Sequence, residues 1–218
     1  MTGEYLTSLT PEHKKFLEDL FKDGVSFDPK VLRVYASDAS LLTGTVLAMV
    51  RPENTGQLCE FMRWANEQRV AVHPRGRGTS LSGGCVPTVP GIVVSMLGMD
   101  IIEINKEDFV AVVEPGVNTA LLQAECEKLG MFYPPDPASG KATSIGGNVI
   151  TCAGGLRAVK YGVTRDYVLG VEAVLPGGQL MKFGGRTHKD VIGLDLGRLF
   201  VGSEGSLGIV TKLILKLL

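Results

Sequence analysis

Apolar residues recur along the chain with helical spacing in three stretches, and each stretch opens with a residue suited to cap a helix. The first pattern covers residues 11–21, where Thr10 can cap the helix and Pro11 suits its first turn. Asn54 and Asn118 stand before the other two patterns, whose apolar residues recur every three to four positions. The sequence therefore predicts three amphipathic helices.

Short apolar runs predict the strands between and after these helices. The predicted strands are residues 46–50, 70–72, 92–94, 101–104, 110–113, 168–175, 179–183 and 207–218, the last run being one strand or a strand pair. The runs 101–104 and 110–113 flank a polar turn, and 168–175 and 179–183 flank Pro176-Gly177-Gly178, so both pairs read as antiparallel.

This mixture of hairpins and few βαβ units favours an α+β fold with two subdomains, residues 1–98 and 99–218. The chain ends on the apolar stretch Ile214–Leu218 without a polar tail. We expect such an end to pack against further structure, so a chain cut at a domain boundary is predicted, with a short natural subunit as the alternative.

Charge and apolar content exclude several classes of function. The 22 basic and 23 acidic residues give a net charge of −1, and no basic run exceeds Lys14-Lys15, which argues against binding nucleic acid. No apolar stretch reaches the roughly 18 residues that span a bilayer. The N-terminus lacks a signal-peptide core, so a cytoplasmic protein is expected. The four cysteines and three histidines are scattered, which predicts reduced thiols and no metal site.

Glycine is unusually frequent, with 28 in 218 residues, or about 13% against a typical ~7%. The glycines cluster at residues 76–84, 146–155, 177–185 and 202–208, between apolar runs. Such clusters suggest backbone that approaches one large ligand closely, although tight turns would also explain part of the excess.

The strongest chemical signal is the loop Pro74–Gly84, which reads PRGRGTSLSGG directly after a predicted strand. Successive backbone N–H groups in such a loop converge on an anion, and the Thr79, Ser80 and Ser82 hydroxyls add donors. A diphosphate fits this donor set, and Arg75 and Arg77 either add charge or face water. A side chain at position 78 is expected to occupy the diphosphate space and to oppose a positive φ.

A nicotinamide-binding Rossmann motif is the competing explanation for this loop. The pattern Gly76-x-Gly78-x-x-Leu81 lacks the third glycine, and no long helix follows it. No acidic residue ends a second strand about 20 residues further on. These departures disfavour the Rossmann interpretation.

Two further segments carry weaker signals. Residues 133–137, YPPDP, hold the backbone extended, and residues 142–148, ATSIGGN, begin a short helix whose N-terminus favours anions. The small residues of 151–155, TCAGG, follow closely. The third signal, residues 201–211, is a glycine-rich turn that enters a strand.

Taken in order, these segments resemble the FAD-linked oxidases of the vanillyl-alcohol-oxidase superfamily. The motifs are PRGxGTSLSGG, PPDP, TSIGGN, CAGG, LRAVKYGVTRDYVLG and RLFVGSEGSLGIVT, and they cover roughly residues 40–218. The best match is the branch of D-lactate dehydrogenases and the glycolate oxidase D subunit. The resemblance implies a PCMH-type FAD-binding domain of two subdomains.

The resemblance also implies which residues contact FAD. The pyrophosphate cradle would be Pro74, Arg75, Gly76, Arg77, Gly78, Thr79, Ser80 and Ser82. The ribityl and flavin side would be Pro135, Asp136, Thr143, Gly146, Gly147 and Asn148, with Ala153, Gly154 and Tyr161 near the isoalloxazine. The adenosine end would be held by Glu204, Gly205 and Ile209, the last through its backbone.

Some positions depart from the family pattern. Thr151-Cys152 stand where Glu-Asn or similar residues are expected, and Leu194 and Gly197 where relatives tend to carry Tyr and Thr. No histidine lies within residues 75–80, where some relatives tether the flavin, and His73 is two residues too early. Non-covalent FAD is therefore expected.

The implied activity is oxidation of a 2-hydroxy acid, such as D-lactate or glycolate, by hydride transfer to FAD. The catalytic base and the arginines for the substrate carboxylate would belong to a C-terminal cap domain, so this chain alone is expected to be inactive. Electrons would leave through an iron–sulfur subunit, a cytochrome or a quinone, with peripheral attachment at the inner membrane face through that partner. The alternatives are a superfamily member with another substrate, such as a nucleotide-sugar reductase or an alkyl-ether-lipid synthase, and a flavin-binding subunit without its own catalysis.

Overall fold

The computed structural model describes residues 5–218 and divides the chain into two compact units. The first unit comprises Met1–Gly98 with Val174–Gln179, and the second comprises Met99–Ala173 with Leu180–Leu218. Residues 174–179 thus depart from the division expected from the sequence. The physical reason is close packing, because a Cβ on Gly178 would lie 2.4 Å from the carbonyl oxygen of Cys59 in the first unit.

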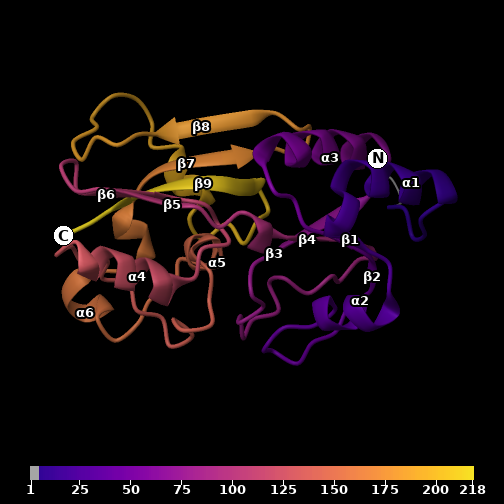
Figure 1. Cartoon of the computed structure of the whole chain (residues 1–218), viewed down its shortest axis with the longest axis horizontal. Helices are drawn as coiled ribbons and strands as arrows, with labels where there is room; N and C mark the ends of the chain where they lie inside the picture. Colours follow the sequence, from indigo (N-terminus) through magenta and orange to yellow (C-terminus); the bar gives the residue numbers. More distant parts are fainter. Residues whose placement is uncertain (1–4) are drawn as a thin grey trace. The chain divides into compact units, whose positions relative to one another are not determined.

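The first unit contains three α-helices and four strands among the residues that the structure describes (Figure 1). In chain order its elements are α1 (Pro11–Phe21), η1 (Lys22–Gly24), β1 (Val25–Ser26), α2 (Pro29–Tyr35), β2 (Val46–Val50), α3 (Thr55–Glu67), β3 (Ala71–Arg75), β4 (Gly91–Ser95) and η2 (Met96–Gly98). The capping roles predicted for Thr10 and Asn54 are confirmed, since their side chains accept hydrogen bonds from the N–H groups of His13 and Gln57. The short elements α2 and β1 were not predicted.

The strands of this unit form one sheet in the order β1-β2-β4-β3. Strand β4 pairs in parallel with both β2 and β3, and β1 pairs antiparallel with β2. Every residue of β4 is buried, which suits its central place and its continuous apolar run. Figure 1 shows α3 and α2 on opposite faces of this sheet.

The second unit holds the remaining elements. In chain order they are β5 (Ile102–Asn105), β6 (Val110–Val113), α4 (Thr119–Lys128), α5 (Ile145–Ile150), α6 (Ala158–Tyr161), η3 (Thr164–Tyr167), β7 (Val168–Val174), β8 (Leu180–Gly184), α7 (Gly197–Phe200) and β9 (Ile209–Lys216). The cap predicted at Asn118 is confirmed, because its side chain accepts a hydrogen bond from the Leu121 N–H.

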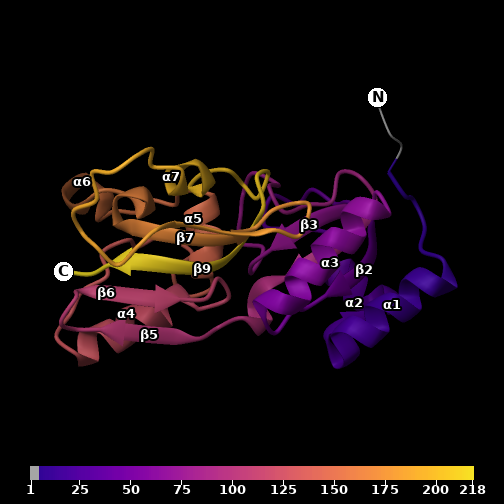
Figure 2. The same ribbon diagram turned by 90° about the horizontal axis from the view of Figure 1, so that it is seen from above.

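The strands of the second unit form a sheet in the order β5-β6-β9-β7-β8, and Figure 2 shows the first four in this sequence. The predicted antiparallel pairing of β5 with β6 is confirmed, and β9 pairs antiparallel with β6. Figure 1 shows α4 and α5 on one face of the sheet. One largely parallel sheet and one sheet with antiparallel pairing, each with helices, confirm the predicted α+β class.

Candidate FAD-binding site

Strand β3 carries the chain into the glycine-rich loop, and it extends further than the apolar pattern predicts. The strand was expected to end at residue 72, but it continues through Pro74 to Arg75, which pairs in register with Ser95 of β4. A proline within this strand is tolerated because β3 lies at the edge of its sheet. The extension fixes where the loop begins.

Arg75 is turned into the protein rather than toward solvent, with 8% of its surface exposed. Its guanidinium donates to the Val34 carbonyl near the end of α2 and to the Cys85 sulfur, each at 3.4 Å, and lies 5.5 Å from the centre of the Tyr35 ring. A cation at the last carbonyls of a helix offsets their partial negative charge. Arg75 therefore ties the loop to α2.

Gly78 lies directly against this buried guanidinium. Its φ is +67°, and a Cβ there would come 2.1 Å from Nη2 of Arg75. The Cβ would thus point at Arg75, whereas the sequence argument placed it in the diphosphate space. The glycine is required both by its backbone conformation and by this close approach.

The loop leaves a set of backbone donors open. The N–H groups of Gly76, Arg77 and Gly78 donate to no acceptor among the described residues, although the Gly78 carbonyl accepts from Ala39 N–H at 3.2 Å. Arg77 is exposed. A fixed loop with free N–H groups and a nearby exposed cation fits a phosphate-bearing ligand.

The hydroxyls expected in the cradle are partly paired with each other. The Ser80 and Ser82 oxygens lie 2.9 Å apart, and the Ser82 N–H donates to the Ser80 oxygen. Thr79 lies between the open N–H groups and this serine pair and is partly exposed. The predicted residues between Pro74 and Ser82 therefore all lie at the end of β3 or in the loop that directly follows it.

A thiol and a carboxylate lie behind the loop. The Cys85 thiol donates to Asp38 Oδ2 at 3.8 Å, while Asp38 Oδ1 accepts from the Ser40 N–H. Burial raises the pKa of the Cys85 thiol, and the positive charge of Arg75 partly opposes this. The thiol is therefore held in its neutral form, which suits a packing role.

His73 does not enter the loop. Its Nε2 lies 2.9 Å from the Val89 carbonyl, and burial lowers the pKa of its imidazole. The ring of this β3 residue is thus engaged with the backbone of the first unit.

In the second unit the residues of TSIGGN form the start of α5, as predicted, but the expected anion site is absent. The Ile145 N–H donates to the Val117 carbonyl at 2.8 Å and the Gly146 N–H to the Pro115 carbonyl at 2.9 Å. The Gly147 N–H donates to the Ser144 hydroxyl, which caps the helix. The expectation of an anion-binding helix start here is wrong, because tertiary contacts use the donors that it requires.

Asn148 is buried in the same helix with both of its polar atoms engaged. Its Oδ1 accepts from the Thr143 hydroxyl at 2.9 Å, and its Nδ2 donates to the Thr119 hydroxyl at 2.7 Å. Asn148 is 2% exposed. The residue joins α5 to the start of α4, and this role is sufficient to explain why an amide stands there.

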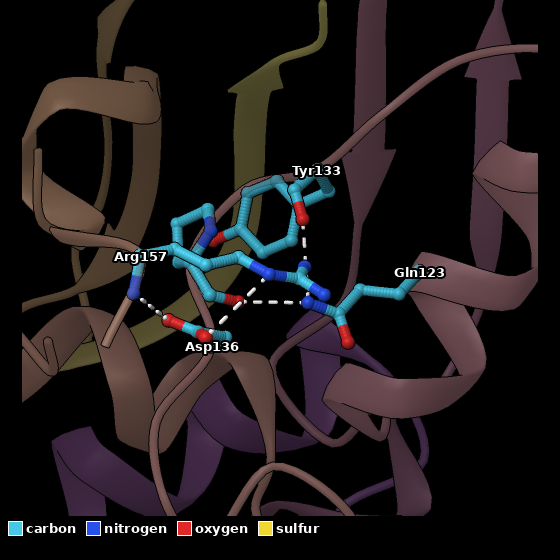
Figure 3. Close-up of polar contacts among 5 residues, drawn as sticks. Gln123, Tyr133, Asp136 and Arg157 are labelled. Atoms are coloured by element: carbon cyan, nitrogen blue, oxygen red, sulfur yellow. Dashed lines mark hydrogen bonds and ion pairs between the residues drawn. The ribbon is translucent and has the colours of Figure 1, made fainter. Parts of the chain in front are cut away.

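The proline-rich stretch is held by a side chain of α4 rather than by its own N–H groups (Figure 3). Gln123 Nε2 donates to the Pro135 carbonyl at 2.8 Å and to the Tyr133 carbonyl at 3.3 Å. Tyr133 is fully buried, and burial raises the pKa of its hydroxyl. Its hydroxyl has no hydrogen-bond partner among residues 5–218.

Asp136 projects from this stretch onto the segment Gly155–Arg157 (Figure 3). Its Oδ1 accepts from the Arg157 N–H at 3.0 Å, and its Oδ2 lies 3.5 Å from Arg157 Nε. A Cβ on Gly155 would lie 2.0 Å from the Asp136 carbonyl oxygen. Sequence reasoning selected Gly154 and missed Gln123, Gly155 and Arg157. The available signal was the sequence Gly154-Gly155-Leu156-Arg157, downstream of an aspartate between prolines.

The remaining predicted contacts surround α5 and the last strand. Ala153 N–H donates to the Asn148 carbonyl at 2.8 Å, and the neighbouring Gly154 is exposed. The Glu204 N–H donates to the Ile150 carbonyl at 2.8 Å, and Glu204 has a φ of +52°. These bonds bring the loops 151–155 and 202–205 to the C-terminal end of α5.

The last predicted contacts differ in exposure. Ile209 is the first residue of β9 and is buried, so only its backbone could meet a ligand. Gly205 follows the exposed Glu204, and its N–H donates to the Ser203 hydroxyl at 3.4 Å. Tyr161 packs edge-on against Phe132 at 5.5 Å and its carbonyl accepts from the Tyr167 hydroxyl.

The described residues also bear on metal binding and on membrane insertion. No group of histidine, cysteine, aspartate or glutamate within residues 5–218 could hold a metal ion. None of the helices in that part of the chain is long and apolar enough to cross a membrane. The four cysteines form no disulfide in the structure.

Comparison with known proteins gives the class to which this fold and these loops belong. A sequence profile of the family described as "FAD binding domain" matches residues 46–184, which span both the glycine-rich loop and the Asp136 segment. The chain therefore belongs to the FAD-binding domain family of FAD-linked oxidoreductases, and FAD is its cofactor.

Several of the curated proteins similar to this chain are named for hydroxy acids. The chain is 50% identical over 171 residues to a glycolate oxidase subunit GlcD of Bacillus subtilis (strain 168), covering 78% of this chain and 36% of that protein. It is 37% identical over 221 residues to a D-lactate dehydrogenase of Anaerostipes hadrus, covering 100% and 46%. A D-2-hydroxyglutarate dehydrogenase of Stutzerimonas stutzeri (strain A1501) is 41% identical over 171 residues, covering 78% and 37%. The chain thus spans less than half the length of these relatives.

Solved structures confirm the PCMH-type fold predicted for the chain. An alkyldihydroxyacetonephosphate synthase superposes with a TM-score of 0.85 at 23% identity, covering 96% of this chain and 40% of the other. Physcomitrella patens BBE-like 1 superposes with a TM-score of 0.77 at 22% identity, covering 93% and 44%. At these identities the likeness establishes the fold alone.

Proposed function

We propose that this chain is the FAD-binding portion of a dehydrogenase that oxidises a small 2-hydroxy acid. The observation that carries the proposal is the loop after β3, whose Gly76, Arg77 and Gly78 N–H groups are open while its base is fixed on Arg75. The relatives named for glycolate, D-lactate and D-2-hydroxyglutarate support the substrate class.

The loop residues would hold the FAD pyrophosphate through backbone N–H groups, with Arg77 adding positive charge. In the second unit, residues near Asp136 and the segment Ala153–Tyr161 would face the flavin, while Glu204, Gly205 and the Ile209 backbone would face the adenosine. FAD held there would supply the two-electron acceptor for the C2 hydride of the hydroxy acid. The free donors of the first unit fit the pyrophosphate of such a ligand.

The part of the chain's own residues in this reaction is binding and orientation. Arg75 and Ala39 fix the loop, so its N–H groups need no rearrangement to meet a diphosphate. The catalytic base and the groups that bind the substrate carboxylate are proposed to lie in a cap domain outside these 218 residues. This chain alone is therefore proposed to bind FAD non-covalently and to turn over no hydroxy acid.

Electrons are proposed to leave through a separate acceptor. The described residues provide no cluster of metal ligands, which would be needed to hold an iron–sulfur centre within them. An iron–sulfur subunit, a cytochrome or a quinone is the proposed acceptor.

Flavin absorbance of the purified chain tests the proposal. We expect a yellow protein, or an apoprotein that gains the flavin spectrum and changes Trp64 emission on titration with FAD, and loss of FAD on acid precipitation. A colourless chain that takes up no FAD would overturn the proposal. Anaerobic addition of D-lactate, glycolate or D-2-hydroxyglutarate should bleach the flavin in the product of the whole gene, and bleaching by none of them would remove the substrate class.

A further inference from the structure

Asp136 was expected to contact the flavin side of FAD, yet its carboxylate is already used within the protein. Both oxygens face Arg157: Oδ1 at 3.0 Å from the backbone nitrogen and Oδ2 at 3.5 Å from Nε. The Asp136 side chain is 24% exposed and that of Arg157 is 44% exposed. Each carboxylate oxygen of Asp136 therefore already has one partner on Arg157.

The contact between the two segments is too close for any residue but glycine at position 155. A Cβ there would meet the Asp136 carbonyl oxygen at 2.0 Å and Oδ1 at 2.4 Å. Backbone and side chain of Asp136 therefore both press on Gly155. The segment 155–157 is shaped by this contact rather than by its own turn alone.

Asp136 is itself anchored from behind. The prolines on both sides of it offer no N–H, so the stretch depends on other donors, and Gln123 Nε2 supplies one to the Pro135 carbonyl at 2.8 Å. Arg157 is supported as well, because its guanidinium lies 5.2 Å from the centre of the Phe132 ring. Since Gln123 of α4 holds the stretch that carries Asp136, the Asp136–Arg157 pair connects α4 to the loop.

The loop is held at its other end by a separate contact. Ala153 N–H donates to the Asn148 carbonyl, and the Ala153 carbonyl accepts from the Thr164 hydroxyl at 2.7 Å. Between the two anchors, Gly154 and Leu156 are exposed and make no hydrogen bond to the described residues. Residues 153–157 thus present one short backbone edge with both ends fixed.

We propose that Asp136 and Arg157 are a positioning pair that sets the conformation of the loop Ala153–Arg157 against FAD, and that Asp136 does not itself contact the cofactor. The proposal rests on the proposed function, because it assigns this loop to the flavin side. The ion pair itself is partly exposed and contributes little to global stability. The pair acts locally, because it fixes the conformation of the loop Ala153–Arg157, which the proline-rich stretch alone would not constrain.

FAD affinity of single and double variants tests the pair. Asp136→Ala should weaken FAD binding by about tenfold, the size expected for a lost charge-assisted hydrogen bond. Asp136→Asn should weaken it less, because its amide oxygen still accepts from the Arg157 N–H, and Arg157→Ala should also weaken it. The double variant should bind no more weakly than Asp136→Ala, since Asp136→Ala already removes both the hydrogen bond from the Arg157 backbone N–H and the ion pair with its side chain. Wild-type affinity in Arg157→Ala, or additive losses in the double variant, would overturn the pair.

Hydrogen exchange of the chain without FAD gives a readout independent of binding. Asp136→Ala should increase exchange several-fold at the amides of Arg157–Gly162, because their anchor is lost. Glu125→Ala is the matched control, since it removes a carboxylate from an exposed pair with Lys128 in the same unit. Weaker FAD binding with unchanged exchange would show direct contact and overturn the proposal.

The two failures are distinguishable. A wild-type chain that binds no FAD would overturn the proposed function. The hydrogen-exchange measurement tests the positioning pair without the cofactor. A shift in the visible circular dichroism of bound flavin in Asp136→Asn is expected if the loop faces the isoalloxazine, and an unchanged spectrum with unchanged affinity would overturn the positioning role.

Discussion

Two glycine-rich regions of this chain look alike in sequence and use their backbone donors in opposite ways. In residues 76–82 the N–H groups of Gly76, Arg77 and Gly78 have no acceptor among the described residues. In residues 143–148 the N–H groups at the start of α5 are all used within the second unit. The first region keeps open the donors that an anion requires, and the second is a scaffold whose glycines permit close packing.

The difference arises from the groups that pack against each glycine-rich region. The buried guanidinium of Arg75 supports the first loop, so the backbone N–H groups of that loop remain open. Carbonyl groups of Val117 and Pro115 lie under α5 and take its amides directly. A glycine motif alone therefore does not identify an anion site, because the site depends on whether neighbouring acceptors have already used the donors.

Gly78→Val tests the first of the two regions and should have the largest effect on FAD affinity. The change forces a branched side chain to a φ of +67° and onto Arg75 Nη2, so the loop should lose its shape. FAD affinity should fall at least about 100-fold, which corresponds to roughly 2.7 kcal/mol. Titration of the apoprotein with FAD measures it.

Gly130→Val is the matched control for backbone strain. Gly130 also has a positive φ, +72°, but a Cβ there would meet nothing within 4 Å. This variant should keep wild-type FAD affinity. Equal affinity in Gly78→Val and wild type would remove the loop from the cofactor site.

Gly155→Ala should destabilise the second unit. The added Cβ collides with the Asp136 backbone, and overpacking of this kind costs about 3 kcal/mol. The adjacent Gly154→Ala is the control, because its Cβ would meet only Val163 Cγ1 at 3.4 Å and Ala158 Cβ at 3.9 Å. Urea unfolding measures both, and equal stabilities would contradict the close contact.

Asn148→Ala should lower stability by about 2 kcal/mol, because it leaves the Thr119 and Thr143 hydroxyls without this amide partner. Asn105→Ala, whose exposed amide bonds Asp108, should cost less. If Asn148 mainly contacts FAD, the apoprotein should keep its stability and only FAD affinity should fall. Thermal unfolding with and without FAD separates the two.

Arg77→Ala should give the smallest effect. An exposed charge contributes little and is screened by salt, so FAD affinity should fall about threefold and the difference should shrink at high ionic strength. Arg33→Ala removes another exposed arginine of the same unit and should leave affinity unchanged. Salt-independent loss in Arg77→Ala would point to a structural role instead.

Much of the secondary structure could be predicted from local patterns. The helix capped by Thr10, the strand 46–50 and the β5–β6 pair follow from periodicity and capping residues within a few positions of one another. The parallel pairing of β3 with β4 was not predicted, and neither was the extension of β3 through Pro74. Both depend on which strand lies alongside, which local pattern does not encode.

The candidate site divides in the same way. The sequence identified the loop at 74–84 and the segment around Asp136 as chemically unusual. It did not reveal that Arg75 points inward, because its partner Val34 stands 41 positions away. Nor did it reveal the Asp136–Arg157 pair, whose members are 21 positions apart.

The sequence by itself determined the helix caps, the strand segments, the glycine loops and, through its motifs, the FAD-binding family. These features depend on short-range spacing and on residue chemistry. Only the tertiary structure decided which N–H groups remain open and which carboxylate is already bound. The physical reason is that a hydrogen-bond donor is available to a ligand only when no acceptor from elsewhere in the chain has been brought within about 3 Å of it.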